Sequence, residues 1–443
     1  MLGMAHALKV ANDLVWSWPL VFFVTGVSAV WTVALGGAQI RCLPRAWRDV
    51  FSGGGDAGTG KVSPRQAFIN TLSANMGNGA FAGMAIAVCA GGPGAGFWAL
   101  VFGILTMSVR FAEVYLSTEY GKNKPASSNV GGPMLYLGDV IGGSVLPYLY
   151  AIPCLLFGMT IGNAIQANSI VMCVETTCGI PHYNYVVAVV LTVLTAYVVM
   201  GGAARVSRFS DMLVPLKVGL FFIPCITLLA YHYANIGHAL WMILLGAFNP
   251  GALAGGALGF TVQQAMRFGL DHSVMANESG LGTAGIMFGF TGSKDATRSA
   301  LMGMLSAFIS TLVCFLVVLC LVASGVWDSG LNSMALNIAA FETLFGGLAG
   351  WLVSTISIIF GLGLLVAYAY VMHAVWMFLT GGKYEWMFNI IYPAFTAFGA
   401  LATVGVVRDL GSLANGLLLY INLFGLLWLL PKVVPKIRAS LFG

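Results

Sequence analysis

The stretch Leu301–Val322 reads LMGMLSAFISTLVCFLVVLCLV and contains no charged residue. A membrane-spanning helix needs roughly 20 consecutive apolar residues to cross the hydrocarbon layer, and this run is long enough. Strands of a membrane β-barrel would alternate apolar and polar residues over about ten positions, which this run does not. Similar runs occur at Val15–Gly36, Tyr185–Met200 and Leu417–Leu430. We therefore predict an all-α polytopic membrane protein.

Composition points the same way. The 443 residues are 59% hydrophobic and only 8% charged, whereas soluble proteins carry about 25% charged residues. The net charge of +5 is interpreted as a topology signal and not as a nucleic-acid footprint. The eight cysteines lie mostly in apolar runs. A disulfide between Cys173 and Cys178, which share a polar loop, is left open.

The apolar runs predict about eleven spans that alternate sides. They are placed at 15–36, 66–90, 95–118, 145–172, 185–200, 210–231, 238–268, 298–324, 347–378, 387–406 and 411–431. With loop 37–65 in the cytoplasm, only Lys9 and Arg408 among the loop basic residues fall outside, as the positive-inside rule favours. We predict one transmembrane domain over 1–443 in the cell (inner) membrane, with the N-terminus outside and the C-terminus cytoplasmic.

Two spans are interrupted by glycine. The second contains Asn75-Met-Gly77-Asn78-Gly79-Ala-Phe81, and the seventh contains Gly246-Ala-Phe248-Asn-Pro250 and continues to Gly256. Glycine lets the backbone leave the helix, and proline removes a ladder hydrogen bond. Freed amides and carbonyls are tolerated in a membrane only where they line a cavity or a ligand. A binding site at these breaks is therefore predicted.

The two interrupted spans lie five apart, which predicts two five-helix halves of opposite orientation at 66–231 and 238–431. The span at 15–36 is then an extra N-terminal helix. Inverted repeats of this kind place the site where their first helices meet. The alternative is that the glycines only permit close helix packing.

Other spans carry isolated polar residues. Asn163 and Gln166 share a helix face and could contact a ligand or join two helices. Lys217 lies inside a span, where a lysine costs roughly 2.5–3.5 kcal/mol and usually faces a pathway, although it could also extend to the cytoplasmic surface. Arg110 and Glu113, at helical spacing, predict a structural ion pair.

At these residues the chain resembles the alanine/glycine:cation symporters, also called the sodium:alanine symporter family. The likeness covers most of the chain. It is carried by Ser63-Pro-Arg-Gln-Ala67, Gly77-Asn-Gly79-Ala-Phe-Ala-Gly83, Gly91-Gly-Pro-Gly94, Phe111-Ala-Glu113, Gly131-Gly-Pro-Met134, Asn163-Ala-Ile-Gln166-Ala-Asn-Ser169, Leu213-Val-Pro215 and Asn277-Glu278-Ser-Gly280-Leu-Gly282. The resemblance implies the LeuT-type fold and secondary transport of a small neutral amino acid, coupled to Na⁺ or occasionally to protons.

The resemblance also implies roles for individual residues. Backbone groups of Gly77, Asn78 and Gly79 would hold the amino acid's carboxylate and ammonium, with Phe81 beside them. Gln166 and Asn163 would contact the substrate, Phe248 would help to occlude it, and Tyr368 would stand where relatives have tryptophan. Asn75 and Gly363 would lie at the ion site. One loop at a span end is expected to hold His272, Asn277 and Glu278. These residues would cap the helix and form a cytoplasmic gate.

The chain departs from the family pattern where relatives bind sodium. Relatives tend to have Ser and Thr hydroxyls in the ninth span, whereas this chain has Gly363 and Leu364. Some members of the wider superfamily place a lysine in the vacant sodium position, and Lys217 lies on the corresponding helix. A desolvated lysine can exchange a proton. We therefore hypothesise that Lys217 replaces, or competes with, sodium.

The rival functions are a membrane-embedded enzyme and a channel. The sequence has no His-Glu-x-x-His motif, no Gly-x-Ser-x-Gly motif and no clustered metal ligands. A channel would be expected to contain a selectivity filter that is repeated by symmetry. We expect no enzymatic cofactor, no nucleic acid and no obligatory protein partner. The lipid bilayer and a small neutral amino acid are the expected partners.

Overall fold

The computed structural model describes residues 2–51, 60, 62–122, 131–178, 183–248, 262–402 and 405–442. Throughout these ranges the regular structure is helical, as predicted. The first half contains α1 (Leu2–Val15), α2 (Trp18–Ala34), α3 (Ala38–Arg41), α4 (Leu43–Phe51), α5 (Pro64–Asn75), α6 (Asn78–Gly91), α7 (Gly94–Gly121), α8 (Pro133–Tyr136), α9 (Leu146–Met159), α10 (Ile165–Cys178), α11 (Tyr183–Val199) and α12 (Gly202–Tyr231). The second half contains α13 (Tyr233–Phe248), α14 (Val262–Asn277), α15 (Thr283–Gly289), α16 (Ala296–Ala323), α17 (Ser333–Phe345), α18 (Ala349–Leu379), α19 (Glu385–Leu401) and α20 (Gly405–Phe442).

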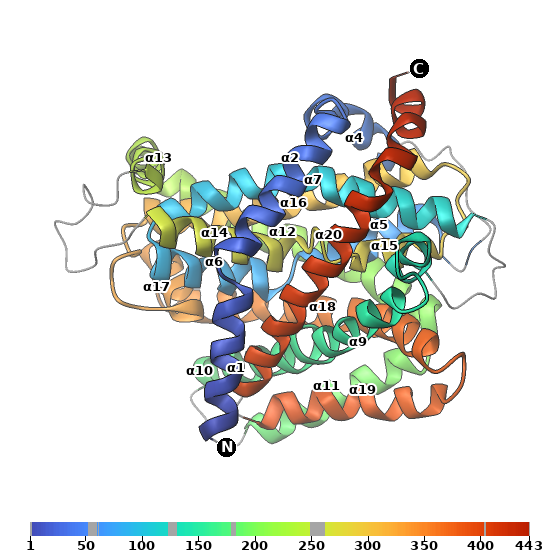
Figure 1. Cartoon of the computed structure of the whole chain (residues 1–443). Helices are drawn as coiled ribbons and strands as arrows, with labels where there is room; N and C mark the ends of the chain where they lie inside the picture. The colour runs from blue at the N-terminus through green and yellow to red at the C-terminus, as the bar shows by residue number, and fades with distance from the viewer. Residues whose placement is uncertain are drawn as a thin grey trace.

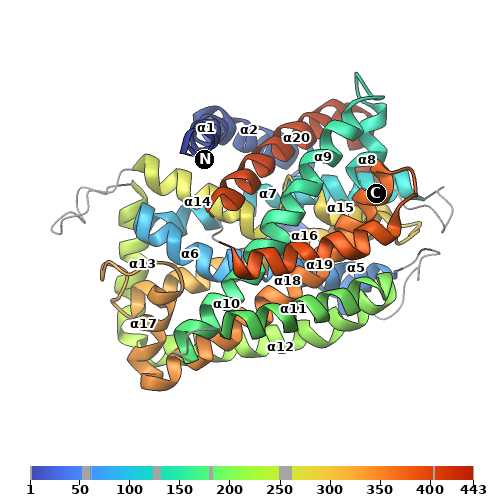
Figure 2. The same ribbon diagram turned by 90° about the horizontal axis from the view of Figure 1, so that it is seen from below.

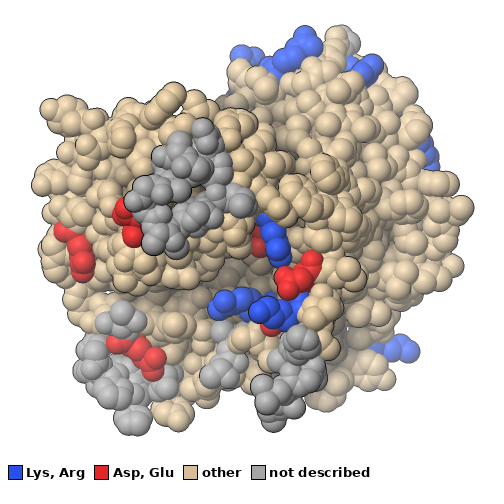
Figure 3. All heavy atoms as spheres, turned by 60° about the vertical axis from the view of Figure 1, so that its left-hand side comes forward, with Lys and Arg blue, Asp and Glu red and all other residues tan. Residues whose placement is uncertain are grey.

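The helices have the length and surface of a membrane protein. Within the described residues, eight helical segments are long and apolar enough to span a bilayer, and Tyr185–Val199 and Tyr233–Phe248 are shorter apolar helices. Large apolar side chains face outward, with Val33 exposed by 75% and Phe22 by 68%. An apolar exterior of this kind suits lipid. In Figure 3 most of the visible surface is neither acidic nor basic, and the charged groups gather in the lower middle and along the top. The structure thus supports a polytopic membrane protein, while the count of eleven spans stays a prediction.

The seventh predicted span, 238–268, was expected to be interrupted. Two helices lie within it: α13 ends at Phe248 and α14 begins at Val262, with 249–261 outside the described residues. Figure 1 shows the two helices with clearly different axes. The predicted break at Gly246–Gly256 lies mostly outside the described residues, as does the side chain of Cys178 in the possible bridge to Cys173.

The two ends of the chain pack together. The amide of Asn12 donates to the carbonyl of Asp409 at 2.8 Å, and Arg438 Nε donates to the carbonyl of Ala34 at 2.7 Å. These contacts make the α1–α2 pair parallel to α20, and Figure 1 shows them crossing the molecule side by side. Figure 2 shows α11 and α12 along the opposite side, with α16 and α18 between. The predicted extra N-terminal helix therefore covers one side of the bundle.

The bundle interior packs through small residues. A Cβ on Gly399 of α19 would lie 2.2 Å from the carbonyl oxygen of Ala164, which is backbone and cannot move aside. We expect Gly399→Ala to destabilise the protein by about 1–3 kcal/mol through overpacking. Gly219→Ala in α12 is the matched control, because a Cβ there meets nothing within 4 Å. Thermal unfolding of the purified variants in detergent measures the difference, and equal melting temperatures would contradict the packing argument.

Candidate functional site

The first break is present where the sequence predicts it. Helix α5 begins with a capping box between Ser63 and Gln66, and it ends at Asn75. Helix α6 begins at Asn78, so Met76 and Gly77 separate the two half-helices. The last carbonyls of α5 consequently have no partner within their own helix. They are free to accept hydrogen bonds from another part of the chain.

Lys217 of α12 supplies those hydrogen bonds. Its Nζ donates to the carbonyl oxygens of Ser73 at 2.7 Å and Met76 at 2.9 Å, and to that of Phe360 in α18 at 3.3 Å. The side chain is fully buried, so it does not extend to the surface. An ammonium has three donors, and these three carbonyls match them. Lys217 therefore ties the first break to α18 as a cation among neutral oxygen atoms.

Gly363 makes room for this arrangement. A Cβ at that position would lie 2.2 Å from Lys217 Nζ and 2.8 Å from Ser73 Oγ. The Ser73 hydroxyl also donates to the carbonyl of Gly363 at 3.2 Å. The predicted ion-site residues Lys217 and Gly363 are thus brought together at one point. Asn75, the third of the set, instead directs its amide toward Ser306 Oγ of α16 at 3.5 Å.

A second break, which the sequence interpretation missed, lies between α14 and α15. Glu278 has φ +54°, Gly280 has φ +97° and Gly282 has φ +80°, so the chain leaves the helix at residues 278–282. Glycine has no Cβ to oppose positive φ, and Glu278 must be held there by its surroundings. The sequence feature that could have indicated this break is the pair of glycines Gly280 and Gly282, which closely follow Asn277-Glu278.

The two breaks lie side by side. The hydroxyl of Ser310 in α16 lies 3.4 Å from the carbonyl oxygen of Asn75 and 3.1 Å from that of Ala276. Asn75 is the last residue of α5, and Ala276 is the last but one of α14. A Cβ on Gly79 would also meet the carbonyl oxygen of Met275 at 3.5 Å. Polar backbone groups from both interrupted helices therefore converge inside the bundle.

A buried network fixes the second break to its neighbours. Glu113 Oε1 accepts from the backbone N–H of Gly282 at 2.9 Å and from the amide of Asn422 at 2.8 Å. The same amide donates to the carbonyl of Gly280 at 2.8 Å, and the hydroxyl of Tyr136 donates to the Asn422 oxygen at 2.5 Å. Helices α7, α8 and α20 thus hold residues 280–282 in place.

Asn422→Leu should destabilise the protein strongly. It would leave Glu113, Gly280 and Tyr136 each short of a buried partner, at about 1–3 kcal/mol per group. Asn415→Leu on the same helix is the matched control, because both amide atoms of Asn415 are buried without a hydrogen-bond partner in the described structure. We expect the control to melt at the wild-type temperature or above. A melting temperature for Asn422→Leu that equals the control would contradict the network's role.

Arg110 and Glu113 form the predicted ion pair. Their side chains are fully buried, with Nη1 and Oε2 3.9 Å apart. The other terminal nitrogen of Arg110, Nη2, donates to the carbonyl of Asn277 at the end of α14. The guanidinium therefore also binds the half-helix that leads into the second break. His272 and Asn277 lie within α14 and not in a loop, which corrects the sequence expectation.

The predicted substrate residues of the fourth span behave differently from one another. The Asn163 amide donates to the carbonyl of Tyr392 at 2.8 Å, and its oxygen accepts from Thr396 Oγ1 at 2.8 Å. Both partners are on α19, so Asn163 joins two helices. Gln166 donates to the carbonyl of Ile161, while its Oε1 is buried without a hydrogen-bond partner in the described structure. Asn163 lies within a π-helical turn at Thr160–Ala164, and Gln166 follows it directly in α10. Such a distortion is common at functional sites.

The remaining predicted substrate residues differ in their burial and in their contacts. Tyr368 is buried, and its hydroxyl has no hydrogen-bond partner among the described residues. Phe81 is buried in an aromatic cluster with Phe221 and Phe360. Asn78 accepts from Ser357 Oγ at 3.0 Å. Phe248 is 57% exposed and packs on Phe97 and Trp98 of α7. The role of Phe248 as an occluding residue stays a prediction.

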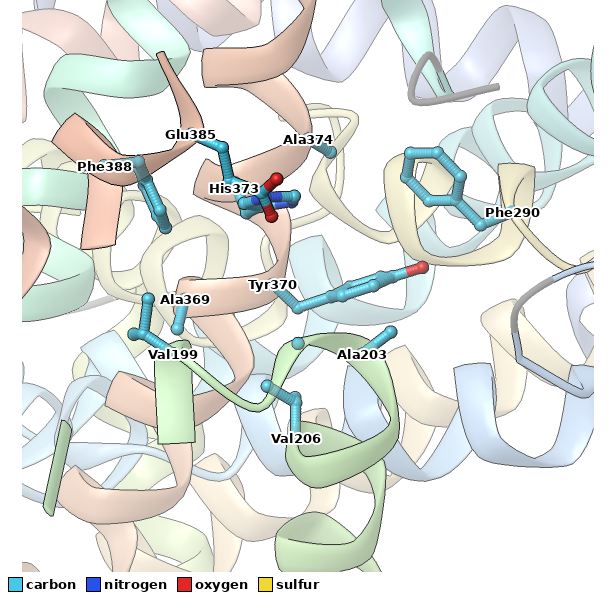
Figure 4. Close-up of a pocket in the computed structure, with 11 residues that line it drawn as sticks. Val199, Ala203, Val206, Phe290, Ala369, Tyr370, His373, Ala374, Glu385 and Phe388 are labelled. Carbon is cyan, nitrogen blue, oxygen red and sulfur yellow. The ribbon is translucent and has the colours of Figure 1, made fainter. Parts of the chain in front are cut away.

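A separate cavity of about 180 Å³ was not predicted. Figure 4 shows Tyr370 and Phe290 on one side of it, and His373, Glu385 and Phe388 on the other. His373 Nε2 lies 3.0 Å from Glu385 Oε1. The hydroxyl of Tyr370 has no hydrogen-bond partner in the described part of the chain. The cavity lies between the ends of α12, α18 and α19, and the residues that line it do not include the predicted site.

A helical membrane protein with two interrupted helices that meet inside the bundle has the architecture of a secondary transporter. Residues 1–439 match the model of the Sodium:alanine symporter family, and the chain belongs to this family. The predicted family is thus confirmed, and it is one of transporters rather than enzymes.

Several relatives match over nearly their whole length. The "Sodium/alanine symporter AgcS" of Methanococcus maripaludis is 29% identical, over 98% of this chain and 96% of its own. An "Uncharacterized transporter" of Haemophilus influenzae is 29% identical over 97% and 95%. The "Probable sodium/glutamine symporter GlnT" of Bacillus subtilis is 27% identical over 97% and 89%.

Proposed function

We propose that the protein is a symporter of a small neutral amino acid such as alanine or glycine, and that it works by alternating access. The observation that carries the proposal is the meeting of two interrupted helices, bridged by Ser310. Half-helix ends offer N–H groups to a carboxylate and carbonyls to an ammonium, which suits a zwitterion. The names of two relatives specify alanine and glutamine, so an amino-acid substrate fits the family.

Within this proposal, backbone groups of Gly77, Asn78 and Gly79 hold the charged ends of the substrate. Gln166 Oε1 and the Tyr368 hydroxyl are buried polar atoms that have no hydrogen-bond partner in the described structure. An amino acid bound between the helices would supply one. Asn163 is left out of the substrate shell, because both ends of its amide are used on α19.

Coupling to protons is favoured by the position of Lys217. The family's description gives sodium as the coupling ion, and sodium-driven symport is the other candidate. In this chain an ammonium already occupies the carbonyl oxygens of the first break. Gly363 and Leu364 offer no hydroxyl for a sodium ion. We infer that Lys217 stands in place of sodium there, and that a proton gradient drives uptake.

Counterflow in proteoliposomes tests the transport function itself. Vesicles preloaded with unlabelled alanine or glycine should accumulate the labelled amino acid transiently, and the rate should saturate with its concentration. Flux that rises linearly without saturation would indicate a channel. Recovery of a chemically altered compound would indicate an enzyme. Absence of counterflow for every small neutral amino acid would overturn the substrate class.

Membrane orientation is also proposed and can be tested separately. The distribution of basic residues favours an N-terminus outside and a C-terminus in the cytoplasm. Single cysteines introduced near either end, in a variant without native cysteines, should be labelled by an impermeant maleimide from outside only at the N-terminal end. The reverse pattern would contradict the orientation.

A further inference from the structure

Buried charge is unequal at the two breaks. Four Lys, Arg and Glu side chains are almost fully buried in the described structure: Arg110, Glu113 and Lys217 are 0% exposed and Glu278 is 4% exposed. Lys217 lies at the first break among neutral carbonyls. The other three gather at the second break, where one guanidinium faces two carboxyl groups. With both carboxyl groups ionised, this cluster would carry an unbalanced negative charge in a low-dielectric interior, which is costly.

Glu113 is the better-stabilised carboxylate of the two. Its Oε1 accepts two hydrogen bonds, from the Gly282 N–H and the Asn422 amide, and Arg110 is its ion-pair partner. Two hydrogen-bond donors on Oε1, together with the Arg110 guanidinium 3.9 Å from Oε2, favour the ionised form. Glu113 is thereby assigned the fixed negative charge that balances Arg110.

Glu278 is held more weakly. Its carboxyl group accepts a hydrogen bond from Thr283 Oγ1 at 2.7 Å, and the Tyr368 hydroxyl also faces it. The cation that faces it is Arg110, which already serves Glu113 and the Asn277 carbonyl. Its backbone has φ +54° inside the break. The groups that face Glu278 from neighbouring elements are Arg110 of α7, Cys154 of α9, Thr283 of α15 and Tyr368 of α18.

Lys217 is less suited than Glu278 to bind and release a transported proton in this conformation. All three of its N–H groups have a carbonyl acceptor. A neutral amine would keep only two donors and would turn a lone pair toward the third carbonyl. The contacts therefore fit an ammonium that stands in the place of a metal ion.

We propose that Glu278 is the proton-binding site of the transport cycle. The inference rests on the proposed amino-acid symport and deepens it. The Glu278 carboxyl group takes a proton from water on one side of the membrane when the second break is open to that side. In the closed form the carboxyl group is neutral and Arg110 balances Glu113. The proton returns to water on the other side, together with release of the amino acid.

The test compares two transport modes of the same proteoliposomes. Glu278→Gln, which mimics the protonated form, should retain counterflow but lose accumulation driven by a proton gradient. Its counterflow should also lose the pH dependence of the wild type. Glu278→Asp keeps a carboxyl group and should keep gradient-driven accumulation. Glu113→Gln should lower the melting temperature and reduce both modes together, as expected for a positioning residue.

The outcomes separate the two proposals. Absence of counterflow in the wild type would overturn the symport function, whatever Glu278 does. Wild-type counterflow, together with accumulation by Glu278→Gln under a proton gradient, would overturn the role of Glu278. Should Glu278→Gln fail to fold, Thr283→Val removes the hydroxyl donor and keeps the carboxyl group. It should shift the pH of half-maximal uptake, and an unchanged pH profile would contradict the proposal.

Discussion

Lys217→Met is expected to abolish proton-driven amino-acid uptake measured without sodium. Methionine fills the same space but donates no hydrogen bond, so the carbonyls of Ser73 and Met76 at the break lose their partner, and the link to the Phe360 carbonyl is lost as well. Each buried acceptor left unpaired costs about 1–3 kcal/mol, and about 1.4 kcal/mol corresponds to a tenfold change in an equilibrium. We therefore expect at least a tenfold loss, measured as the initial rate of radiolabelled uptake.

Lys383→Met is the matched control, since Lys383 is exposed at the end of α18. It should transport like the wild type. Sodium-driven uptake that continues unchanged in Lys217→Met would show that sodium does not share this position with Lys217. That result would favour ordinary sodium symport.

Gly363→Ala should have the second-largest effect, and the effect should depend on Lys217. The added methyl group would lie 2.2 Å from Lys217 Nζ and 2.3 Å from Cε, which forces the ammonium away from its carbonyls. In a Lys217→Ala background the two closest contacts are removed, and the close contact that remains is Ser73 Oγ at 2.8 Å. Neighbouring residues of this kind show coupling energies of about 0.5–3 kcal/mol.

A double-mutant cycle measures this coupling through thermal unfolding and uptake. Gly363→Ala should cost much less in the Lys217→Ala protein than in the wild type. Gly350→Ala, on the same helix where a Cβ meets nothing within 4 Å, is the control for helix propensity. Strictly additive effects of Gly363→Ala and Lys217→Ala would contradict the contact.

The helical class and the first break could be predicted from local sequence, whereas local sequence left open whether Lys217 is buried or extends to the cytoplasmic surface. Uncharged runs such as Leu301–Val322 have one stable form in a membrane. The glycines around Asn78 lie inside such a run, so the interruption is visible without knowledge of the fold. The hydrogen-bond partners of Lys217 could not be predicted, because Ser73 and Phe360 are 144 and 143 residues away in the chain.

The break at 278–282 was missed for a physical reason. Gly246–Gly256 is richer in glycine and contains Pro250, so it gives the stronger local signal. Residues 278–282 depend instead on Glu113 and Asn422, which reach them from α7 and α20. Similarly, spacing left the role of Asn163 open, and its two hydrogen bonds to α19 assign it to helix packing.

We infer that Lys217 stands in for sodium and that the protein is an amino-acid symporter. The deciding measurement is uptake of radiolabelled alanine and glycine into proteoliposomes, under an imposed proton gradient or an imposed sodium gradient. We expect accumulation with the proton gradient in sodium-free buffer, and its loss in Lys217→Met. Accumulation that requires the sodium gradient, and is insensitive to the proton gradient, would contradict it.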